Sequence, residues 1–331
     1  MTAARVIDRR VAPAVVVGAG IAGIACAGAL ADAGLDVRLI DRGRRIGGRM
    51  ASRRYAERPV DTGASYVTAR DPRFQAVVAD WVERGLARPW TDTFHVATPE
   101  GLQGTRTGPM RYAAPAGLRS LVEDLAARLA PEYPHEVEGV EHDPRTGVLR
   151  VDGDEAGAVA LCMPGPQALD LLPDHLADDR AAADRTWEPA LALVAHWPTR
   201  AWPALDGAFV NESPVLSFVA DDGRRRGDDV PVLVAHSDPL LAAAHLDHPL
   251  AAGPVMLAEV SAALGIDAAP DSWDVRRWSL AKPLASRDEP FHLGAAGIGL
   301  AGDGWHGPSR VEAAYLSGLA LGEALAERLT R

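Results

Sequence analysis

The 331-residue chain contains few cysteines, a single lysine and no internal repeat. Cys26 and Cys162 lie far apart and form no CxxC pair, which argues against a disulfide framework or a zinc site and favours a reduced, cytoplasmic setting. Lys282 is the one lysine, and the net charge of −11 argues against nucleic acid as the main partner. A chain of this length can bury a substantial core, and we expect two closely connected domains.

The N-terminus superficially resembles a secretory signal, because Arg5, Arg9 and Arg10 precede an apolar run over residues 11–33. Four glycines interrupt that run, and three of them belong to the motif described next. Removing the segment would destroy that motif. We therefore expect neither a signal peptide nor a membrane span.

Residues 14–50 carry the clearest pattern in the chain. A short apolar strand leads into the turn GAGIAG at residues 18–23, and an alanine-rich helix and a second strand ending at Asp41 follow. This order is typical of a dinucleotide-binding βαβ unit: the first glycine allows the tight turn, the second lets the backbone approach a pyrophosphate, and the third lets helix and strand pack closely. The N–H groups at the helix start favour phosphate, and a carboxylate at Asp41 can accept hydrogen bonds from ribose hydroxyls.

A second glycine turn, Gly47-Gly48, precedes Arg49, whose guanidinium can bind a phosphate through two hydrogen bonds. A domain that binds only a nicotinamide cofactor has no need of this extra clamp. The segment from Asp41 to Arg49 resembles the D/E-R/K-x(4)-G-G-R segment of amine oxidase-type flavoproteins, which bind FAD. We therefore predict non-covalent FAD; the alternative interpretation is a solvated arginine-rich loop.

Residues 60–74, VDTGASYVTARDPRF, resemble the D-x-G-A-Q-Y-F-T-A-R-D-x-R-F stretch of the renalase family of small FAD-dependent oxidases, with Ser65 in place of the usual glutamine. Together with the glycine turns, a strand before residue 140 and the C-terminal GD…RVEAAYLSG segment, the resemblance covers nearly the whole chain. It implies an α/β fold with a Rossmann-like FAD-binding domain and an interleaved mixed-sheet substrate domain. The expected FAD-binding domain comprises residues 1–75, 136–175 and 292–331, and the expected substrate domain comprises 76–135 and 176–291.

Local patterns predict several elements inside these domains. We expect helices over residues 75–88, 118–129 and 309–329, strands over 136–141 and 208–219, and short strands and loops over 89–113.

The resemblance also assigns roles to cofactor-binding residues. It implies that Asp303 binds the ribityl–phosphate region, that the Val311 amide faces the flavin pyrimidine and that the backbone of Val137 meets the adenine. The predicted cofactor-binding residues are Gly18, Gly20, Ile21, Ala22, Gly23, Asp41, Arg42, Gly48, Arg49, Ala64, Ser65, Val137, Gly302, Asp303, Arg310, Val311 and Ala314.

Renalases oxidise dihydronicotinamide isomers of NAD(P)H by hydride transfer to flavin N5, and O2 then reoxidises the flavin to give hydrogen peroxide. Such chemistry needs orientation more than acid–base groups, which fits the absence of an obvious catalytic dyad or triad. His236, displaced by one position from the family's histidine, and Lys282, where the family has arginine, are the candidate catalytic residues; core packing and a surface position are the alternatives. The predicted substrate-binding residues are Tyr66, Thr68, Arg70, Tyr112, Trp187, Trp278 and Trp305.

One segment departs from the family pattern. Asp221 and Asp222 replace an Arg-Asn pair in the stretch 218–227, so the substrate need not be a dinucleotide if that stretch handles it. Two alternatives to a renalase-like oxidase remain: a flavin amine oxidase that tailors a biosynthetic intermediate, and a non-catalytic nucleotide-binding protein, as Rab GDP dissociation inhibitors are. We expect a small-molecule substrate and O2 as partners, no nucleic acid and no membrane; the sequence leaves the oligomeric state open.

Overall fold

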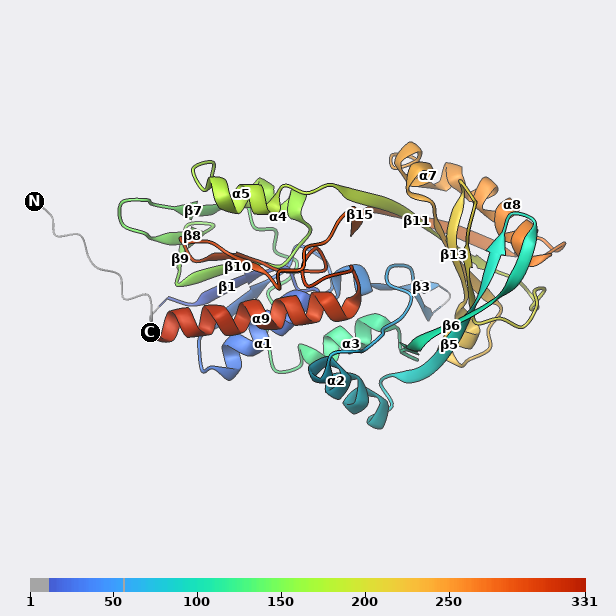
Figure 1. The fold of residues 1–331 in the computed structure, drawn as a ribbon, viewed down its shortest axis with the longest axis horizontal. Coiled ribbons are helices and arrows are strands. Elements are labelled where there is room, and N and C mark those ends of the chain that lie inside the picture. The colour runs from blue at the N-terminus through green and yellow to red at the C-terminus, as the bar shows by residue number, and fades with distance from the viewer. Residues whose placement is uncertain (1–11, 56) are drawn as a thin grey trace, which may run out of the picture. The chain divides into compact units, whose positions relative to one another are not determined.

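The structure, a computed structural model, describes residues 12–55 and 57–331 (Figure 1). Arg5, Arg9 and Arg10, on which the expectation about a signal peptide partly rests, lie outside these residues. The chain forms two compact units, which we call the parallel-sheet unit (up to Gly48, 122–187 and 282–331) and the mixed-sheet unit (49–121 and 188–281). This grouping differs from the expected domain boundaries, most clearly by placing residues 49–75 with the mixed sheet. The division into functional domains stays a prediction.

The parallel-sheet unit contains a five-stranded sheet in the order β16-β17-β10-β1-β2. Four strands run parallel, and β16 pairs antiparallel at one edge. The central strands β1 and β10 are apolar throughout and fully buried, as expected for a parallel sheet covered on both faces. The strands are β1 (Ala14–Val17), β2 (Val37–Ile40), β10 (Ala158–Leu161), β16 (His292–Leu293) and β17 (Ile298–Leu300).

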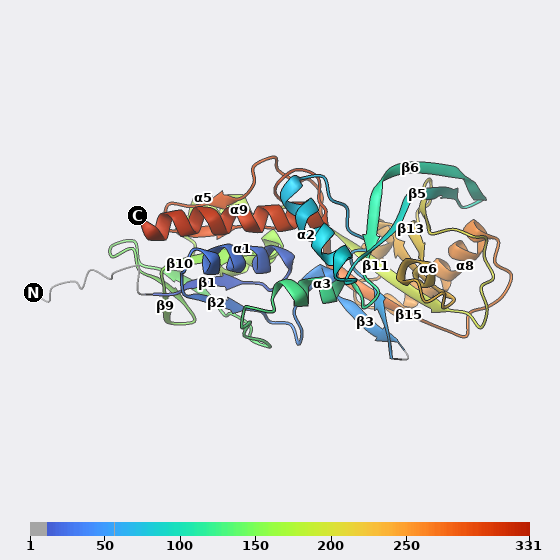
Figure 2. The ribbon, with the colours of Figure 1, turned by 90° about the horizontal axis from the view of Figure 1, so that it is seen from below.

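Helices α1 (Ile21–Asp32) and α9 (Val311–Thr330) lie side by side, as Figures 1 and 2 both show. Their contact is made by backbone. A Cβ added at Gly318 would lie 1.9 Å from the carbonyl oxygen of Ala22, and one at Gly322 would lie 2.5 Å from that of Cys26. The small residues of α9 are therefore needed to pack against α1.

The two cysteines, distant in sequence, come together inside this unit as buried free thiols. A hydrogen bond with Cys162, together with burial, raises the pKa of the Cys26 thiol. The expectation of no disulfide framework concerned spacing alone and did not foresee this contact.

Further elements complete the unit. A three-stranded antiparallel sheet, β7-β8-β9, and the helices α4 and α5 add apolar side chains to its core. The strand expected over residues 136–141 is wrong in extent, because the Asp152 carboxylate accepts the backbone N–H groups of Glu138 (2.8 Å) and Gly139 (3.2 Å) that a strand would offer to a neighbour. The bounds are β7 (Val140–His142), β8 (Leu149–Val151), β9 (Asp154–Ala156), α4 (Gly165–Leu171) and α5 (Ala177–Ala183).

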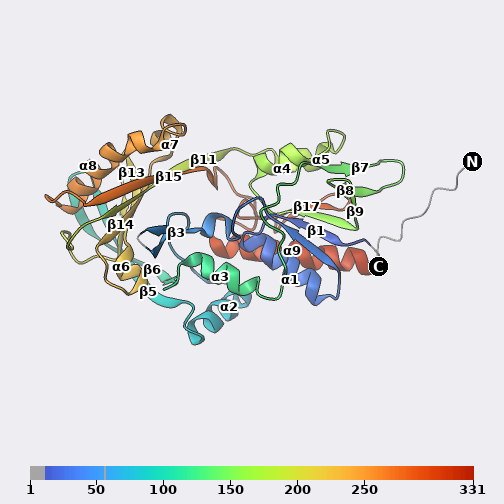
Figure 3. The same ribbon diagram turned by 180° about the vertical axis from the view of Figure 1, so that it is seen from behind.

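The mixed-sheet unit is built on a seven-stranded sheet in the order β15-β11-β14-β13-β12-β5-β6. Helix α8 (Gly253–Leu264) packs on this sheet (Figure 3), and Met256 and Val260 of α8 join the sheet's buried core. A short hairpin, β3-β4, precedes the sheet. The strands are β3 (Ser52–Tyr55), β4 (Arg58–Asp61), β5 (Arg88–Thr98), β6 (Gly101–Ala113), β11 (Trp187–His196), β12 (Gly207–Val210), β13 (Leu216–Asp221), β14 (Val232–Ser237) and β15 (Ser272–Pro283).

Helices and short turns connect these strands or leave the sheet. They are η1 (Gly48–Met50), α2 (Pro72–Glu83), α3 (Leu118–Leu125), α6 (Asp222–Arg226), α7 (Pro239–Ala244), η2 (Pro249–Ala252) and α8 (Gly253–Leu264). None of the helices among the described residues is long and apolar enough to cross a membrane.

Several predicted elements need correction. Residues 89–113 form one long hairpin, β5-β6, whose outer strand is mostly exposed and so lacks the apolar alternation that would have marked it. The single strand expected over 208–219 is two antiparallel strands, β12 and β13. Helix α2 begins three residues early, because Asp71 caps it by accepting the N–H of Arg73 (2.9 Å) and Pro72 suits its first turn.

Candidate functional site

The GAGIAG turn has the geometry that its glycines predicted. Gly18 has a φ of 103°, and a Cβ there would lie 2.7 Å from the carbonyl oxygen of Cys162. A Cβ at Gly23 would lie 1.8 Å from the carbonyl oxygen of Gly18, so the strand, turn and helix can meet only without side chains. Gly20 is different: a Cβ there would find only Gly48 Cα, at 4.0 Å. The backbone at Gly20 is therefore open to a ligand.

The two glycine turns touch each other. The N–H of Gly47 donates to the carbonyl oxygen of Ala19 (2.9 Å), and a Cβ on Gly48 would lie 3.3 Å from Gly20 Cα. No side chain caps the N-terminus of α1, and its first turn holds no acidic residue. Among the described residues, this combination offers backbone N–H groups and a positive helix end to an anion.

Asp41 has a role that the sequence did not reveal. Its carboxylate accepts the N–H of Ala19 (2.6 Å) and the N–H of Gly43 (2.7 Å), so it holds the phosphate turn in place. Each carboxylate oxygen keeps lone pairs for further donors such as ribose hydroxyls.

The C-terminal segment of the parallel-sheet unit follows strand β17. Gly302 has a φ of 150°, and its N–H donates to Ser317 Oγ (3.0 Å) on α9. Asp303 is buried, and its carboxylate accepts the Ser309 hydroxyl (2.5 Å). This pairing orients Asp303 within the 302–310 loop.

Arg310 stands in extended conformation just before α9, and no side chain caps the helix start. Its guanidinium forms an ion pair with Glu312 (3.2 Å), which is buried. Val311 and Ala314 belong to the first turn of α9. Helix α9 therefore presents an N-terminus whose side-chain charges are matched and whose backbone donors are uncapped.

In the mixed-sheet unit, residues 61–65 are held at every position. Gly63 is in tight contact, since a Cβ there would lie 2.0 Å from the Arg49 carbonyl oxygen and 3.1 Å from the Trp278 indole. The Ala64 N–H donates to that same Arg49 oxygen (2.9 Å), and Trp278 Nε1 donates to the Thr62 carbonyl (2.7 Å). Gly63 thus packs against the chain's own Trp278.

A buried ion network fastens the two ends of this segment. Arg225 donates to the carbonyl oxygens of Ser65 (3.1 Å) and Asp61 (3.2 Å), and Arg226 donates to the Asp61 carboxylate (2.8 Å). Asp222 is fully buried and accepts from both arginines and from Arg58. Burial raises the pKa of Asp222, but the charges of these arginines outweigh it and hold the pKa well below its usual range.

The stretch 218–227 is therefore not a loop that presents Asp221 and Asp222 outward, since both side chains are buried. Asp221 accepts from Arg200 Nε (2.8 Å) and Trp202 Nε1 (2.9 Å). Sequence reasoning missed the positioning role of Arg58, Arg225 and Arg226. The i, i+3 and i, i+4 spacing from Asp222 to Arg225 and Arg226 was the available signal.

Two buried polar atoms beside the 61–65 segment have no hydrogen-bond partner among the described residues, namely Thr62 Oγ1 and His236 Nε2. Burial and the charge of Arg225 lower the pKa of His236 to about 4, so its imidazole is neutral at pH 7. Buried polar atoms left without partners are uncommon in folded proteins and point to a bound ligand or water.

Other predicted substrate residues of this unit lie in different surroundings. Tyr66 packs in an aromatic cluster with Trp90, Phe94 and Phe218. Tyr112 and Val67 exchange two backbone hydrogen bonds, so Tyr66 and Thr68 flank a single isolated bridge. Arg70 is exposed.

The remaining predicted residues belong to the parallel-sheet unit. Trp187 and Trp305 line a common pocket there, while Lys282 is exposed. Arg42 is largely exposed and faces Glu136 at 3.6 Å, and Val137 contributes its side chain to the core. None of these observations tests their assigned roles, which stay predictions.

Comparisons with known proteins bear on the fold. A family model for an NAD(P)-binding Rossmann-like domain matches residues 16–81. Similar solved structures include a protein described as a protoporphyrinogen oxidase from an Exiguobacterium species (15% identity, TM-score 0.74, covering 96% of this chain and 99% of that one). The cyclohexylamine oxidase from Brevibacterium oxydans matches at 16% identity and a TM-score of 0.75, covering 97% of this chain and 100% of that one. A fatty acid isomerase from P. acnes matches at 11% identity and a TM-score of 0.68, covering 96% of this chain and 99% of that one.

The predicted α/β fold class is confirmed. The chain combines a Rossmann-like domain with a mixed sheet, as these full-length matches do. At such low identity the likeness establishes architecture, and the presence of an isomerase among the matches shows that architecture alone does not choose the reaction.

Proposed function

We propose that this protein is an FAD-dependent oxidoreductase that holds its cofactor non-covalently. The observation that carries the proposal is the meeting of two glycine turns at the uncapped start of α1, with Gly20 open and Asp41 alongside. This arrangement fits a dinucleotide pyrophosphate and an adjacent ribose. The oxidases among the similar structures, which include a putrescine oxidase, support the same reading.

When bound, FAD would accept a hydride from the substrate at N5 and pass two electrons to O2, giving hydrogen peroxide with two protons. The chain's own residues would bind and orient the cofactor and the substrate. The N–H groups at the start of α1 would bind the pyrophosphate, and the buried Asp303 would hold the ribityl–phosphate region. The 61–65 segment, fixed by Arg225 and Arg226, would present a rigid backbone with Thr62 Oγ1 and His236 Nε2 as available polar atoms.

We further propose a renalase-like substrate class, dihydronicotinamide isomers of NAD(P)H, on the strength of the VDTGASYVTARDPRF stretch. Hydride transfer from such a molecule needs no general base, and a pKa lowered to about 4 makes the partly buried His236 a weak base. A second candidate is oxidation of an amine, favoured by the cyclohexylamine and putrescine oxidases among the similar structures.

The first test is the colour of the purified full-length protein. We expect the visible absorbance of oxidised flavin, with FAD recovered in the supernatant after acid precipitation. Protein that contains no flavin and takes up none would leave the non-catalytic alternative. With flavin present, anaerobic mixing with dihydronicotinamide isomers, and separately with cyclohexylamine and putrescine, identifies the reductant by loss of that absorbance.

Lys282 offers a second test, which separates the two half-reactions. We propose that its ammonium assists reduction of O2 electrostatically, so Lys282→Met should leave anaerobic flavin reduction intact and slow reoxidation about tenfold or more, roughly 1.4 kcal/mol of barrier. Slower reduction with normal reoxidation would assign it to substrate positioning. Unchanged rates in both would make it a surface residue, in keeping with its exposure.

A further inference from the structure

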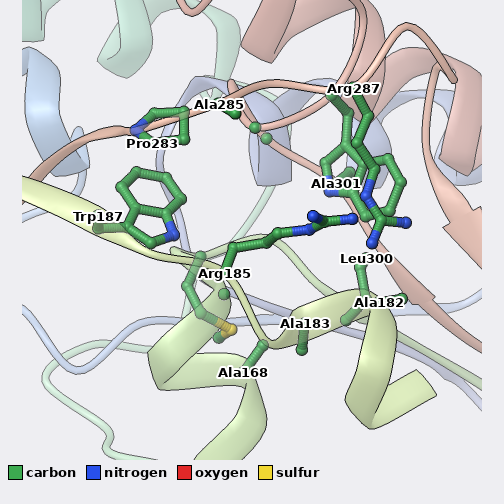
Figure 4. A pocket seen from close by; sticks show the side chains of 15 residues that line it. Ala168, Ala182, Ala183, Arg185, Trp187, Pro283, Ala285, Arg287, Leu300 and Ala301 are labelled. Carbon is green, nitrogen blue, oxygen red and sulfur yellow. The ribbon is translucent and has the colours of Figure 1, made fainter. Parts of the chain in front are cut away.

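A pocket opens in the parallel-sheet unit at the carboxyl ends of β10 and β17, the edge where ligands of parallel sheets bind. Alanine side chains, Met163 and Leu300 form much of its lining, and Trp187 and Trp305 add two indoles (Figure 4). The walls are thus apolar except for two arginines.

Those arginines, Arg185 and Arg287, extend toward each other across the pocket in Figure 4. The Arg287 guanidinium lies over the Trp305 ring, 4.7 Å from its centroid. Backbone hydrogen bonds fix the chain on which it stands: the Arg287 N–H donates to Gly304 (3.0 Å), and its carbonyl accepts from Gly307 (2.8 Å). Arg287 is therefore placed by its surroundings before any ligand arrives.

Neither guanidinium donates a hydrogen bond to, or forms an ion pair with, any group in the described part of the chain, and Arg287 Nε is buried. The opposing charge that acts on Arg287 is that of the exposed Glu289. Burial, and then the charge of Arg185, lower the pKa of Arg287. Two like charges thus face each other at an energetic cost.

The chain has 45 acidic and 34 basic residues, and two of its other partly buried arginines pair with acidic side chains: Arg38 pairs with Glu132 and Asp154, and Arg200 pairs with Asp221 and Asp229. An uncompensated arginine pair in a concave, apolar site of an acidic protein is what an oxyanion ligand would complete.

We propose that this pocket binds the phosphate or carboxylate group of a small molecule between Arg185 and Arg287, with the apolar part of that molecule against the indoles. Trp187 and Trp305 are also predicted substrate-binding residues, so the site deepens the proposed function, but binding of an anion between the two arginines does not itself require bound flavin. FAD itself carries phosphates, but the open turn at Gly20 already provides for them. The experiment must therefore distinguish binding of an independent anion from binding of the FAD phosphates.

The test uses the full-length protein as purified, titrated calorimetrically with inorganic phosphate and with benzoate at constant ionic strength. We expect Arg287→Met and Arg185→Met each to weaken binding of at least one probe about tenfold or more, as for a lost charge-assisted hydrogen bond. The matched control is Arg145→Met, which removes one exposed positive charge of the same unit and should bind as the wild type does. Arg185 is exposed, so its replacement keeps the fold even if Arg287→Met does not.

Flavin content, measured on the same samples, distinguishes the two sources of anion. Retained FAD with lost probe binding supports the proposal. Loss of FAD in both pocket variants, with displacement of the probe by added FAD, would show that the arginines serve the cofactor's phosphates and overturn it. Failure of both probes to bind the wild type, or unaltered binding in both variants, would also overturn it. A protein that binds the probes but never flavin would refute the proposed function and leave this site standing.

Discussion

Replacing Asp222 by asparagine removes one negative charge from the buried ion network and keeps the size of the side chain. In the intact network three guanidiniums face three carboxylates, and Asp222 is the one carboxylate that contacts all three arginines. Asp61 and Asp228 would still serve Arg226 and Arg58. Arg225 would keep only backbone carbonyl oxygens among the described residues.

Because Arg225 is fully buried, this change leaves a charge without a counterion inside the protein. Removing one partner of a buried pair costs about 3–5 kcal/mol of folding free energy. This cost depends on pH. The low pKa of Asp222 in the folded protein stabilises the fold above pH 3.8, the ordinary pKa of an aspartate, and this stabilisation is lost as the pH falls toward the pKa of Asp222 in the folded protein. Asp222→Asn should therefore differ from the wild type most above pH 4.

The assay is denaturant unfolding of the full-length protein, with saturating FAD in every sample so that cofactor loss does not dominate. Asp174→Asn is the control, since Asp174 is exposed and pairs only with Arg180 at 3.4 Å in the described structure; it should change stability little. The double variant Asp222→Asn/Arg225→Gln should lose less than the sum of the single variants, because both charges are then absent. A loss below about 1 kcal/mol for Asp222→Asn would refute the reasoning.

Three further predictions concern other parts of the chain. Stability should rise with pH between about 4 and 6.5, by up to about 1.4 kcal/mol per pH unit, because the unfolded chain binds a proton there that the partly buried His236 of the folded chain does not; His236→Gln should flatten that slope in unfolding curves. Gly318→Ala should cost about 1–3 kcal/mol, since its Cβ would lie 1.9 Å from the Ala22 carbonyl oxygen, whereas Gly28→Ala, with 3.5 Å of clearance, should be neutral or stabilising by up to about 1 kcal/mol. Asp41→Ala should weaken FAD retention by roughly 1.5–3 kcal/mol in equilibrium dialysis, with the exposed Asp36→Ala as control, and unchanged affinity would contradict its assigned contact.

The Rossmann-like unit was predictable because its signals are local. Gly18 and Gly23 must be glycines because a Cβ at either position would clash with a backbone carbonyl oxygen, and a short apolar strand followed by such a turn is typical of a dinucleotide-binding unit. The β5-β6 hairpin was not predictable in the same way, since the exposed strand Gly101–Ala113 carries no apolar face. Hydrophobic periodicity marks strands that bury apolar side chains on one face, and it gives no signal for a strand whose two faces are both exposed to solvent.

The buried network escaped prediction for a related reason. Hydrophobic patterns assign DDGRRR at 221–226 to the surface, yet Asp222 and Arg225 are among the most buried residues of the unit. Their burial depends on Asp61, more than 150 positions earlier, and on the carbonyl of Ser65. Contacts between residues so far apart in the sequence depend on the tertiary structure, and the charge spacing on α6 is the one sequence feature that indicates them.

The backbone contact between α1 and α9 has a consequence for biosynthesis. These helices lie far apart in the sequence, and the sheet that they pack against draws on residues 14–17, 158–161 and 298–300. The strands β1 and β2 can pair on emergence from the ribosome, but their neighbour β10 follows more than 100 residues later, and β17 and α9 follow later still. Because long-range closure is slow and leaves apolar strands uncovered meanwhile, we expect folding yield to depend on chaperone supply and on the elongation rate of the last part of the chain.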